Sequence, residues 1–182
     1  MIRNFLMLLI FFGCQYQVPK PNAGFALEYP KPDYIYLDQK NDCYYEFMHN
    51  SNAKLDKLSA CAVTLNYPSL KAKLYITYFD LKKYTYDTLL LDFQKRLGVF
   101  GKKSLLLQQS SYENNKKGIL GSCVTLIGNS PSNLHFFGTD KTNHFITGSL
   151  LFNAKPNYDS IVPAIEYVKT DVQRLLETLV WK

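Results

Sequence analysis

The stretch Ser160–Leu179, SIVPAIEYVKTDVQRLLETL, has the most regular pattern in the chain. Its apolar residues recur at steps of four and three, which places them in one stripe along an α-helix. The stripe consists of Ile161, Ile165, Val168, Val172, Leu175 and Leu179. The solvated side is predicted to carry Glu166, Lys169, Asp171, Arg174 and Glu177. A stripe of this kind usually packs against a sheet, and less often against a partner helix.

The ends of this helix are predicted from its flanking residues. Asp159 or Ser160 can accept hydrogen bonds from the first free backbone N–H groups. Pro163 is tolerated only within the first turn, because proline has no amide hydrogen to donate. Trp181 is expected at the end of the helix, where it docks the C-terminus together with Tyr167.

Upstream of this helix, two similar runs of strands are predicted, each followed by a helix. The strands are rich in Tyr, Val, Ile and Leu with partial alternation. The first run is Tyr34–Leu37, Cys43–Met48, Ala60–Asn66 and Ala72–Phe79, and the second is Ser104–Tyr112, Leu120–Ile127, Leu134–Phe137 and His144–Phe152. A helix is predicted over Tyr86–Leu97 between them, capped by Thr85 or Asp87 and ended by Gly98 and Gly101. The fold class is therefore α+β, with an antiparallel sheet of about six to eight strands covered by two long helices.

The N-terminus has the layout of a short export signal. Arg3 precedes an unbroken apolar run, Phe5–Phe12, which is followed by Gly13 and Cys14. The run is shorter than the ~20 residues that span a bilayer, and a cysteine directly after a small residue resembles a bacterial lipoprotein signal. We expect Cys14 to be acylated with fatty chains such as palmitate and to become the new N-terminus. Two alternatives are an ordinary cleaved signal with a chance cysteine and an uncleaved apolar strand.

Three segments follow from this pattern: a signal peptide over 1–13, a proline-rich tether over 14–33, and a single globular domain over 34–182. The tether contains Pro-Lys-Pro twice, at Pro19–Pro21 and Pro30–Pro32, a composition that favours an extended chain. No acidic cluster follows Cys14, so a periplasm-facing position on the inner or the outer membrane is expected.

The charge distribution and the cysteine spacing argue against nucleic-acid binding and against a zinc site. The formal charge of +6 comes from dispersed lysines, without a basic cluster interleaved with aromatics, which argues against nucleic-acid binding. No histidine or second cysteine stands at zinc-ligand spacing from Cys43, Cys61 or Cys123. We interpret these three cysteines as small buried hydrophobes, of which Cys43 and Cys61 lie on neighbouring predicted strands and can form one bridge. Neither a metal site nor a cofactor site is predicted.

Two segments together resemble a known family. They are Leu134–Phe152, LHFFGTDKTNHFITGSLLF, and Asp159–Lys182, DSIVPAIEYVKTDVQRLLETLVWK. The ordered elements that carry the resemblance are Thr139, Asp140, His144, Phe145, Gly148, Asp159, Ser160, Pro163, Ile165–Tyr167 and Trp181–Lys182. In this set the chain is similar to GldD, a lipoprotein family of the Bacteroidota gliding-motility and type IX secretion apparatus. Tyr29–Leu37 resembles the family's Pro-Lys-Pro opening, with Asp33 in place of a glycine.

The resemblance implies a non-enzymatic component or accessory factor of that envelope machinery, whose partners are the membrane and other envelope proteins. It also directs attention to the turn Thr139–Asn143, so Thr139, Asp140, Lys141 and His144 are the candidate interaction patch. The strand order resembles the PsbP/Mog1-like sandwich, an analogy of fold alone.

Two other functions stay open at this stage. A carrier of a small apolar ligand or lipid between the sheet and a helix is favoured by the content of Tyr and Phe. A periplasmic hydrolase would use His144, with Ser149 or Cys123 as nucleophile. No motif of a nucleophile elbow or a cysteine protease accompanies them. We therefore expect Asp140 to close the turn and His144 to begin a strand, and we assign no catalytic residue.

Overall fold

The computed structural model describes residues 29–37, 43–57, 61–153 and 157–182. Within these ranges, seven strands form one antiparallel sheet. Their bounds are β4 Lys54–Lys57, β5 Val63–Tyr67, β6 Ala72–Asp80, β7 Ser104–Asn114, β8 Ile119–Gly128, β9 Leu134–Thr139 and β10 His144–Phe152. Four shorter strands form two small sheets: β1 Tyr34–Tyr36 pairs with β3 Met48–Asn50, and β2 Tyr45–Glu46 pairs with β11 Val180–Trp181.

The spatial order of the large sheet is β4-β5-β6-β10-β9-β8-β7. Strands β4 to β6 form one meander, and helix α1, Tyr86–Phe100, then crosses to the far edge of the sheet. Strands β7 to β10 return as a second meander until β10 pairs with β6, with Gly148 opposite Ile76. The second predicted run joins this sheet together with the strands predicted at Ala60–Asn66 and Ala72–Phe79. The predicted strands Tyr34–Leu37 and Cys43–Met48 lie instead in the two small sheets, and Cys43–Met48 is divided between β2 and β3.

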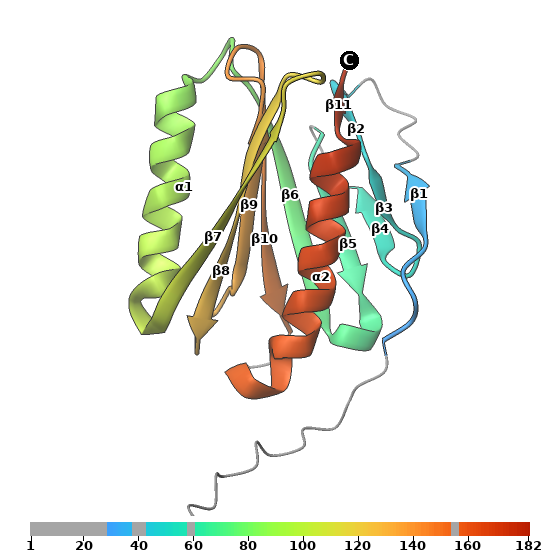
Figure 1. The fold of residues 1–182 in the computed structure, drawn as a ribbon, viewed down its shortest axis with the longest axis vertical. Helices are drawn as coiled ribbons and strands as arrows, with labels where there is room; N and C mark the ends of the chain where they lie inside the picture. Colours follow the sequence, from blue (N-terminus) through green and yellow to red (C-terminus); the bar gives the residue numbers. More distant parts are fainter. Residues whose placement is uncertain (1–28, 38–42, 58–60, 154–156) are drawn as a thin grey trace, which may run out of the picture.

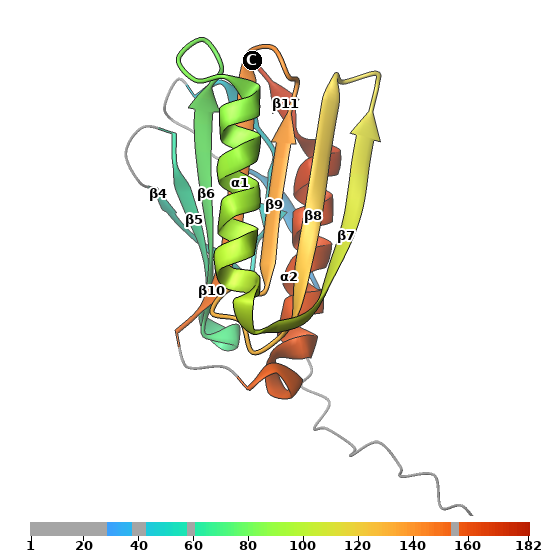
Figure 2. The same ribbon diagram turned by 90° about the vertical axis from the view of Figure 1, so that its left-hand side faces the viewer.

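Two helices cover opposite faces of the sheet (Figures 1 and 2). Helix α1 has 15 residues and is continued by a 3₁₀ turn, Gly101–Lys103, whereas α2, Tyr158–Thr178, has 21 residues. The α+β class is confirmed, and of the two expected long helices α2 is clearly the longer.

The predicted stripe of α2 forms the larger core. Ile165, Val168 and Val172 have no exposed surface, and they pack with the inner residues of the strands and with Tyr45 and Phe47. A smaller core lies on the other face of the sheet, where Leu89 and Phe93 of α1 meet Val124, Leu126, Phe137 and Phe145. The helix periodicity therefore predicted the buried face of α2 in outline. Of the residues placed on the solvated side, Asp171 is buried, at 3% exposed, and Ala164 and Leu176 are buried although they lie outside the predicted stripe.

The predicted boundaries of both helices need correction. Thr85 caps α1 as expected, but the helix continues through Gly98 and ends at Phe100. The N-cap of α2 is Asn157, so Asp159 and Ser160 are already helical and Pro163 lies beyond the first turn. Because position 163 offers no amide hydrogen, one intrahelical bond is missing there.

The chain after α2 also differs from the prediction. Trp181 belongs to β11, where it pairs with Tyr45, and not to the end of the helix. The C-terminus is docked as expected, since Lys182 N donates a hydrogen bond to the carbonyl of Tyr44 and Lys182 Nζ contacts Glu46 at 2.6 Å. Tyr167, the expected second contributor, packs on Tyr29 instead.

Cys43 and Cys61 form a disulfide, and Cys123 is a buried free thiol. The bridge joins the segment before β2 to the segment before β5, so it ties the N-terminal strands to the main sheet. The bridge that the sequence left open is confirmed.

The last residues of the expected tether lie against the domain. The Tyr29 ring packs on Tyr167, with 5.3 Å between centroids, and the Tyr167 hydroxyl donates to the carbonyl of Pro30 at 2.9 Å. Ser51 N donates to the carbonyl of Asp33 at 2.7 Å. Among the described residues, Tyr29, Pro30 and Asp33 of the expected tether already contact the domain, whereas the predicted signal peptide, Cys14 and residues 15–28 fall outside the described residues.

Candidate functional site

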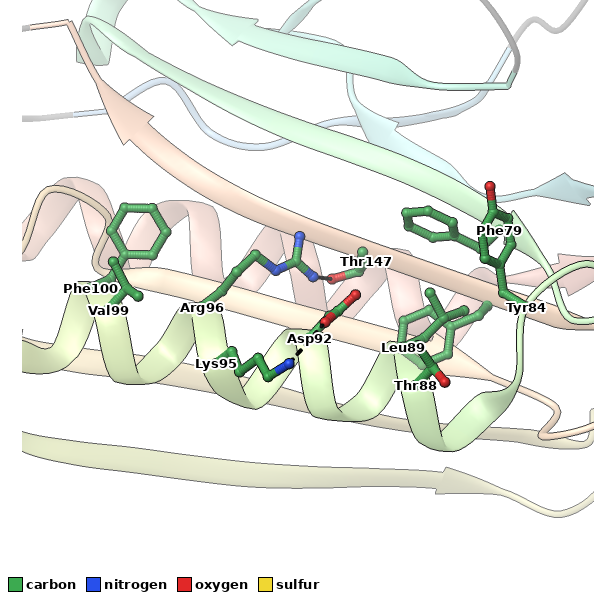
Figure 3. Close-up of a pocket in the computed structure, with 11 residues that line it drawn as sticks. Phe79, Tyr84, Thr88, Leu89, Asp92, Lys95, Arg96, Val99, Phe100 and Thr147 are labelled. Atoms are coloured by element: carbon green, nitrogen blue, oxygen red, sulfur yellow. Dashed lines mark hydrogen bonds and ion pairs between the residues drawn. The ribbon is translucent and has the colours of Figure 1, made fainter.

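A cavity of about 690 Å³ lies between α1 and the strands β6 and β10 (Figure 3). Its walls are mainly apolar. They are formed by Phe79, Tyr84, Thr88, Leu89, Asp92, Lys95, Arg96, Val99, Phe100, Phe145 and Thr147. The cavity exists because α1 contacts the sheet chiefly over β8, β9 and β10, so the helix leaves a gap above β6. Its volume falls within the range of about 300–1,000 Å³ that is usual for small-molecule sites.

Arg96 is the polar centre of this cavity. Its Nη2 donates to Thr147 Oγ1 at 3.1 Å, while its Nε–H is buried and has no acceptor among the described residues. Burial lowers the pKa of the guanidinium, and the charge of Asp92 acts in the opposite direction. A buried donor without an acceptor costs about 1–3 kcal/mol. The cavity thus contains a cation whose hydrogen-bonding capacity is only partly used.

The acidic neighbour of Arg96 is engaged elsewhere. Asp92 lies one helical turn earlier and is 3.9 Å from Lys95 Nζ, and both side chains are exposed at the rim. No ion pair joins Asp92 to Arg96 within the described part of the chain. The positive charge inside the cavity is therefore not neutralised by a direct contact.

Arg96 is not among the residues predicted from the sequence, although its signal is present in the helix pattern. Arg96 follows Phe93 by three residues and precedes Phe100 by four, so it lies on the face that looks at the sheet. A cation on the buried face of a predicted amphipathic helix is the feature that marks the site.

The predicted patch at Thr139–His144 is a tightly bonded turn. Asp140 Oδ1 accepts hydrogen bonds from the backbone N–H groups of Thr142, Asn143 and His144 at 3.0, 2.8 and 2.8 Å. Partial burial by itself would raise the pKa of Asp140, but these three donors and the charge of His144 outweigh it and lower the pKa below 3.8. The expected role of Asp140 in closing the turn is confirmed.

One member of the patch is not at the surface. Thr139 is fully buried; its hydroxyl donates to the carbonyl of His144 at 2.6 Å and accepts from Lys141 N at 2.9 Å. Thr139 therefore supports the turn, because it lies in β9 beneath it, and cannot contribute to a contact surface. Lys141 is exposed and Asp140 and His144 are half-buried.

The structure separates His144 from the serine considered as its nucleophile. His144 Nδ1 shares a hydrogen bond with the Tyr78 hydroxyl at 2.9 Å, and its ring stacks on Trp181 with 5.1 Å between centroids. Ser149 Oγ instead lies 2.9 Å from Nδ1 of His135, whose Nε2 contacts the carbonyl of Ser132.

Burial makes the side chains of His135 and Cys123 chemically unreactive. Burial lowers the pKa of His135 to about 4, so this ring is neutral at physiological pH. Burial also raises the pKa of the Cys123 thiol to about 12, which removes its nucleophilic form. In the part of the chain that the structure describes, no three His, Cys, Asp or Glu side chains are grouped so that they can hold a metal ion.

A second apolar surface lies at the far edge of the sheet. Leu105, Leu106 and Leu107 of β7 are 89%, 60% and 46% exposed, next to a groove of about 530 Å³ beside α1. Within the described part of the chain, strand β7 has 11 residues and pairs on one side, with β8, whereas β4 at the other edge of the sheet has four residues. Long edge strands with apolar side chains are uncommon in proteins that remain unpartnered.

Comparison with protein families identifies the chain. A family model described as "Gliding motility lipoprotein GldD" matches residues 14–181. The chain belongs to the GldD family. The match begins at Cys14 and includes the segment predicted to be a tether, both meanders and both helices. A comparison with curated proteins found no match.

Membership of the GldD family supports a role in gliding motility, and the description of the family as lipoproteins suggests a membrane-anchored envelope location. None of the helices in the described residues is long and apolar enough to cross a bilayer.

Proposed function

We propose that this GldD-family chain is a lipid-anchored, periplasm-facing and non-enzymatic component of the gliding-motility and type IX protein secretion machinery. The observation that carries the proposal is the extent of the family match, which starts at Cys14, the residue predicted to be acylated, and continues through the folded domain. In this proposal fatty chains on Cys14 hold the protein to the inner or the outer membrane. The tether then enters the domain at Tyr29 and Pro30, against Tyr167 of α2.

Replacing Cys14 by serine tests the anchor directly. The variant is expected to lose labelling by a fatty-acid probe completely and to move from the membrane fraction to the water-soluble fraction, because the thiol that carries the chains is absent. The control is Cys123→Ser, which changes a buried thiol and should keep both labelling and membrane location. A Cys14→Ser protein that stays labelled and membrane-bound would refute the anchor.

The apparatus role requires contact with other envelope proteins, and two surfaces are proposed for it. One is the exposed part of the predicted patch, Asp140, Lys141 and His144. The other is the leucine edge of β7, Leu105–Leu107, which has no neighbouring strand on its outer side among the described residues and could pair with an extended segment.

Crosslinking in whole envelopes, with partners identified by mass, distinguishes these surfaces. Leu105→Lys is expected to reduce recovery of the crosslinked partner several-fold, because it places a charge on an apolar contact. The double variant Asp140→Lys/Lys141→Glu exchanges the two charges and tests whether partners bind through the turn. Leu91→Lys, at an exposed leucine on α1, is the matched control. Full retention of partners in both test variants would reject contact through either surface.

One observation favours the second candidate function, carriage of a small apolar ligand: the cavity between α1 and the sheet has the size and apolar lining of a ligand site. No comparable observation favours a hydrolase, because the His144 ring is bonded to Tyr78 and stacked on Trp181.

A further inference from the structure

The cavity of Figure 3 is elongated along α1. From Thr88 to Phe100 the helix axis advances by about 18 Å. Val99 and Phe100 close one end of the cavity, and Phe79, Tyr84 and Leu89 lie at the other (Figure 3). A long apolar trough of this shape fits a linear chain better than a compact ring system.

The charges of the cavity select the chemistry of the ligand's head group. The Arg96 guanidinium points between the helix and the sheet toward Thr147, and it lacks a carboxylate partner among the described side chains. At the rim the single negative charge of Asp92 is offset by Lys95, 3.9 Å away. The net charge along the trough is therefore positive.

We propose that this cavity binds a single-chain fatty carboxylate, with its head group at Arg96 and its hydrocarbon chain along α1 toward Leu89 and Phe79. A carboxylate presents two coplanar oxygens, which match the parallel N–H groups of a guanidinium. The hydrocarbon chain would cover the exposed parts of the aromatic walls.

The site is distinct from the proposed contact surfaces and from the Cys14 anchor. Leu105–Leu107 border a different groove, and the turn at Asp140 lies at the end of β9. A chain that fails to bind fatty carboxylates can still be a lipoprotein of the gliding apparatus, and a chain that lacks acylation can still bind them.

Isothermal titration calorimetry with dodecanoate tests the proposal, with the full-length Cys14→Ser chain and ligand kept below its micelle concentration. The expected result is saturable one-to-one binding. Dodecanol and dodecyltrimethylammonium have the same chain without the carboxylate, and both are expected to bind at least about ten-fold more weakly.

Variants then locate the head group. Arg96→Met keeps the apolar stem and removes the charge, and it is expected to weaken dodecanoate binding by about ten-fold or more while leaving dodecanol binding unchanged. Arg96→Lys keeps a positive charge but loses the planar guanidinium. Its dodecanoate affinity should lie between those of the parent chain and Arg96→Met. If Arg96→Met does not fold, Arg96→Lys replaces it as the test variant. Arg174→Met, at the guanidinium on α2 on the opposite face of the sheet, should bind dodecanoate like the parent chain.

Three results would overturn the proposal. They are absence of saturable dodecanoate binding, equal binding of dodecanoate and dodecyltrimethylammonium, and a dodecanoate affinity equal to that of the parent chain in folded Arg96→Met or, where that variant does not fold, in Arg96→Lys.

Discussion

Replacing Asp171 by alanine is expected to lower the free energy of unfolding by about 2–4 kcal/mol. Asp171 lies on α2 inside the core, and it accepts hydrogen bonds from the hydroxyls of Tyr34 and Tyr67 at 2.8 and 3.0 Å and from Asn50 Nδ2 at 3.0 Å. Asn50 and Tyr67 are almost completely buried, so the substitution leaves the Tyr67 hydroxyl and one N–H of the Asn50 amide without an acceptor, while Asn50 Nδ2 still donates to the Tyr167 hydroxyl at 2.9 Å. The loss exceeds that of an exposed substitution because each orphaned buried donor carries its own desolvation cost.

Urea denaturation of the wild type and Asp171→Ala measures this loss. Gln173→Ala, at an exposed position of the same helix, is the control and should stay within about 0.5 kcal/mol of the wild type. If the two variants were equally stable, the carboxylate would not hold Tyr34 and Asn50 to α2.

The contribution of Asp171 to the stability of the fold depends on pH, and the direction of this dependence follows from its pKa. Burial raises the pKa of Asp171 above 3.8, although the hydrogen bonds from Asn50, Tyr34 and Tyr67 partly oppose this. The native state therefore holds the proton more tightly than the unfolded chain, and stability falls as pH rises from about 3.8 through the native pKa. Compared with Asp171→Asn, which does not titrate, the wild type should lose stability over that window and then level off. An increase over the same window would contradict the dominance of burial.

Replacing Gly148 by alanine is expected to destabilise the fold by about 3 kcal/mol or more, at the upper end of the cost of overpacking a core. Gly148 lies on β10 between β6 and β9, opposite Ile76 and Phe136. A Cβ atom there would collide with the Phe136 ring and would lie 2.7 Å from the backbone oxygen of Tyr75. Neither can yield easily, because Phe136 is fully buried and the oxygen belongs to the neighbouring strand.

The same exchange at Gly98 is the matched control. Gly98 lies inside α1, and an added Cβ atom would meet nothing within 4 Å. Gly98→Ala should therefore stabilise the protein by about 0.5–1 kcal/mol through helix propensity alone. Thermal unfolding of both variants measures the contrast, and a Gly148→Ala protein as stable as the wild type would show that the close packing of Phe136 is unnecessary.

Patterns that repeat within one element predicted the fold well. Strand β10 has the predicted bounds, His144–Phe152, because its apolar residues and flanking turns are local signals. Strand β4, Lys54–Lys57, was missed because its sequence, KLDK, has one apolar residue and little strand propensity. The tight turn at Asp140 was predictable for the same local reason, since its donors lie two to four residues further along the chain.

Features that depend on distant partners were not predictable. Asp171 was assigned to the solvated face of its helix because it is charged, although it stands three residues after Val168 and four before Leu175, at the border of the apolar stripe. Its partners Tyr34, Tyr67 and Asn50 lie more than 100 positions away. Arg96 was missed similarly, because the cavity around it forms only when α1 is placed on β6 and β10. A charged residue on the buried face of a helix indicates that it has an interaction partner, but the sequence alone does not show which residue or ligand this partner is.

In the proposed function, the mature protein begins with an acylated cysteine at position 14. The most direct test is the intact mass of the protein extracted from the membranes of the cells that make it, with sequencing of its N-terminal peptide. We predict a chain that starts at Cys14 and is heavier than its sequence by the mass of the attached fatty acyl groups. A water-soluble, unmodified chain that retains Met1 and the apolar leader would contradict the claim.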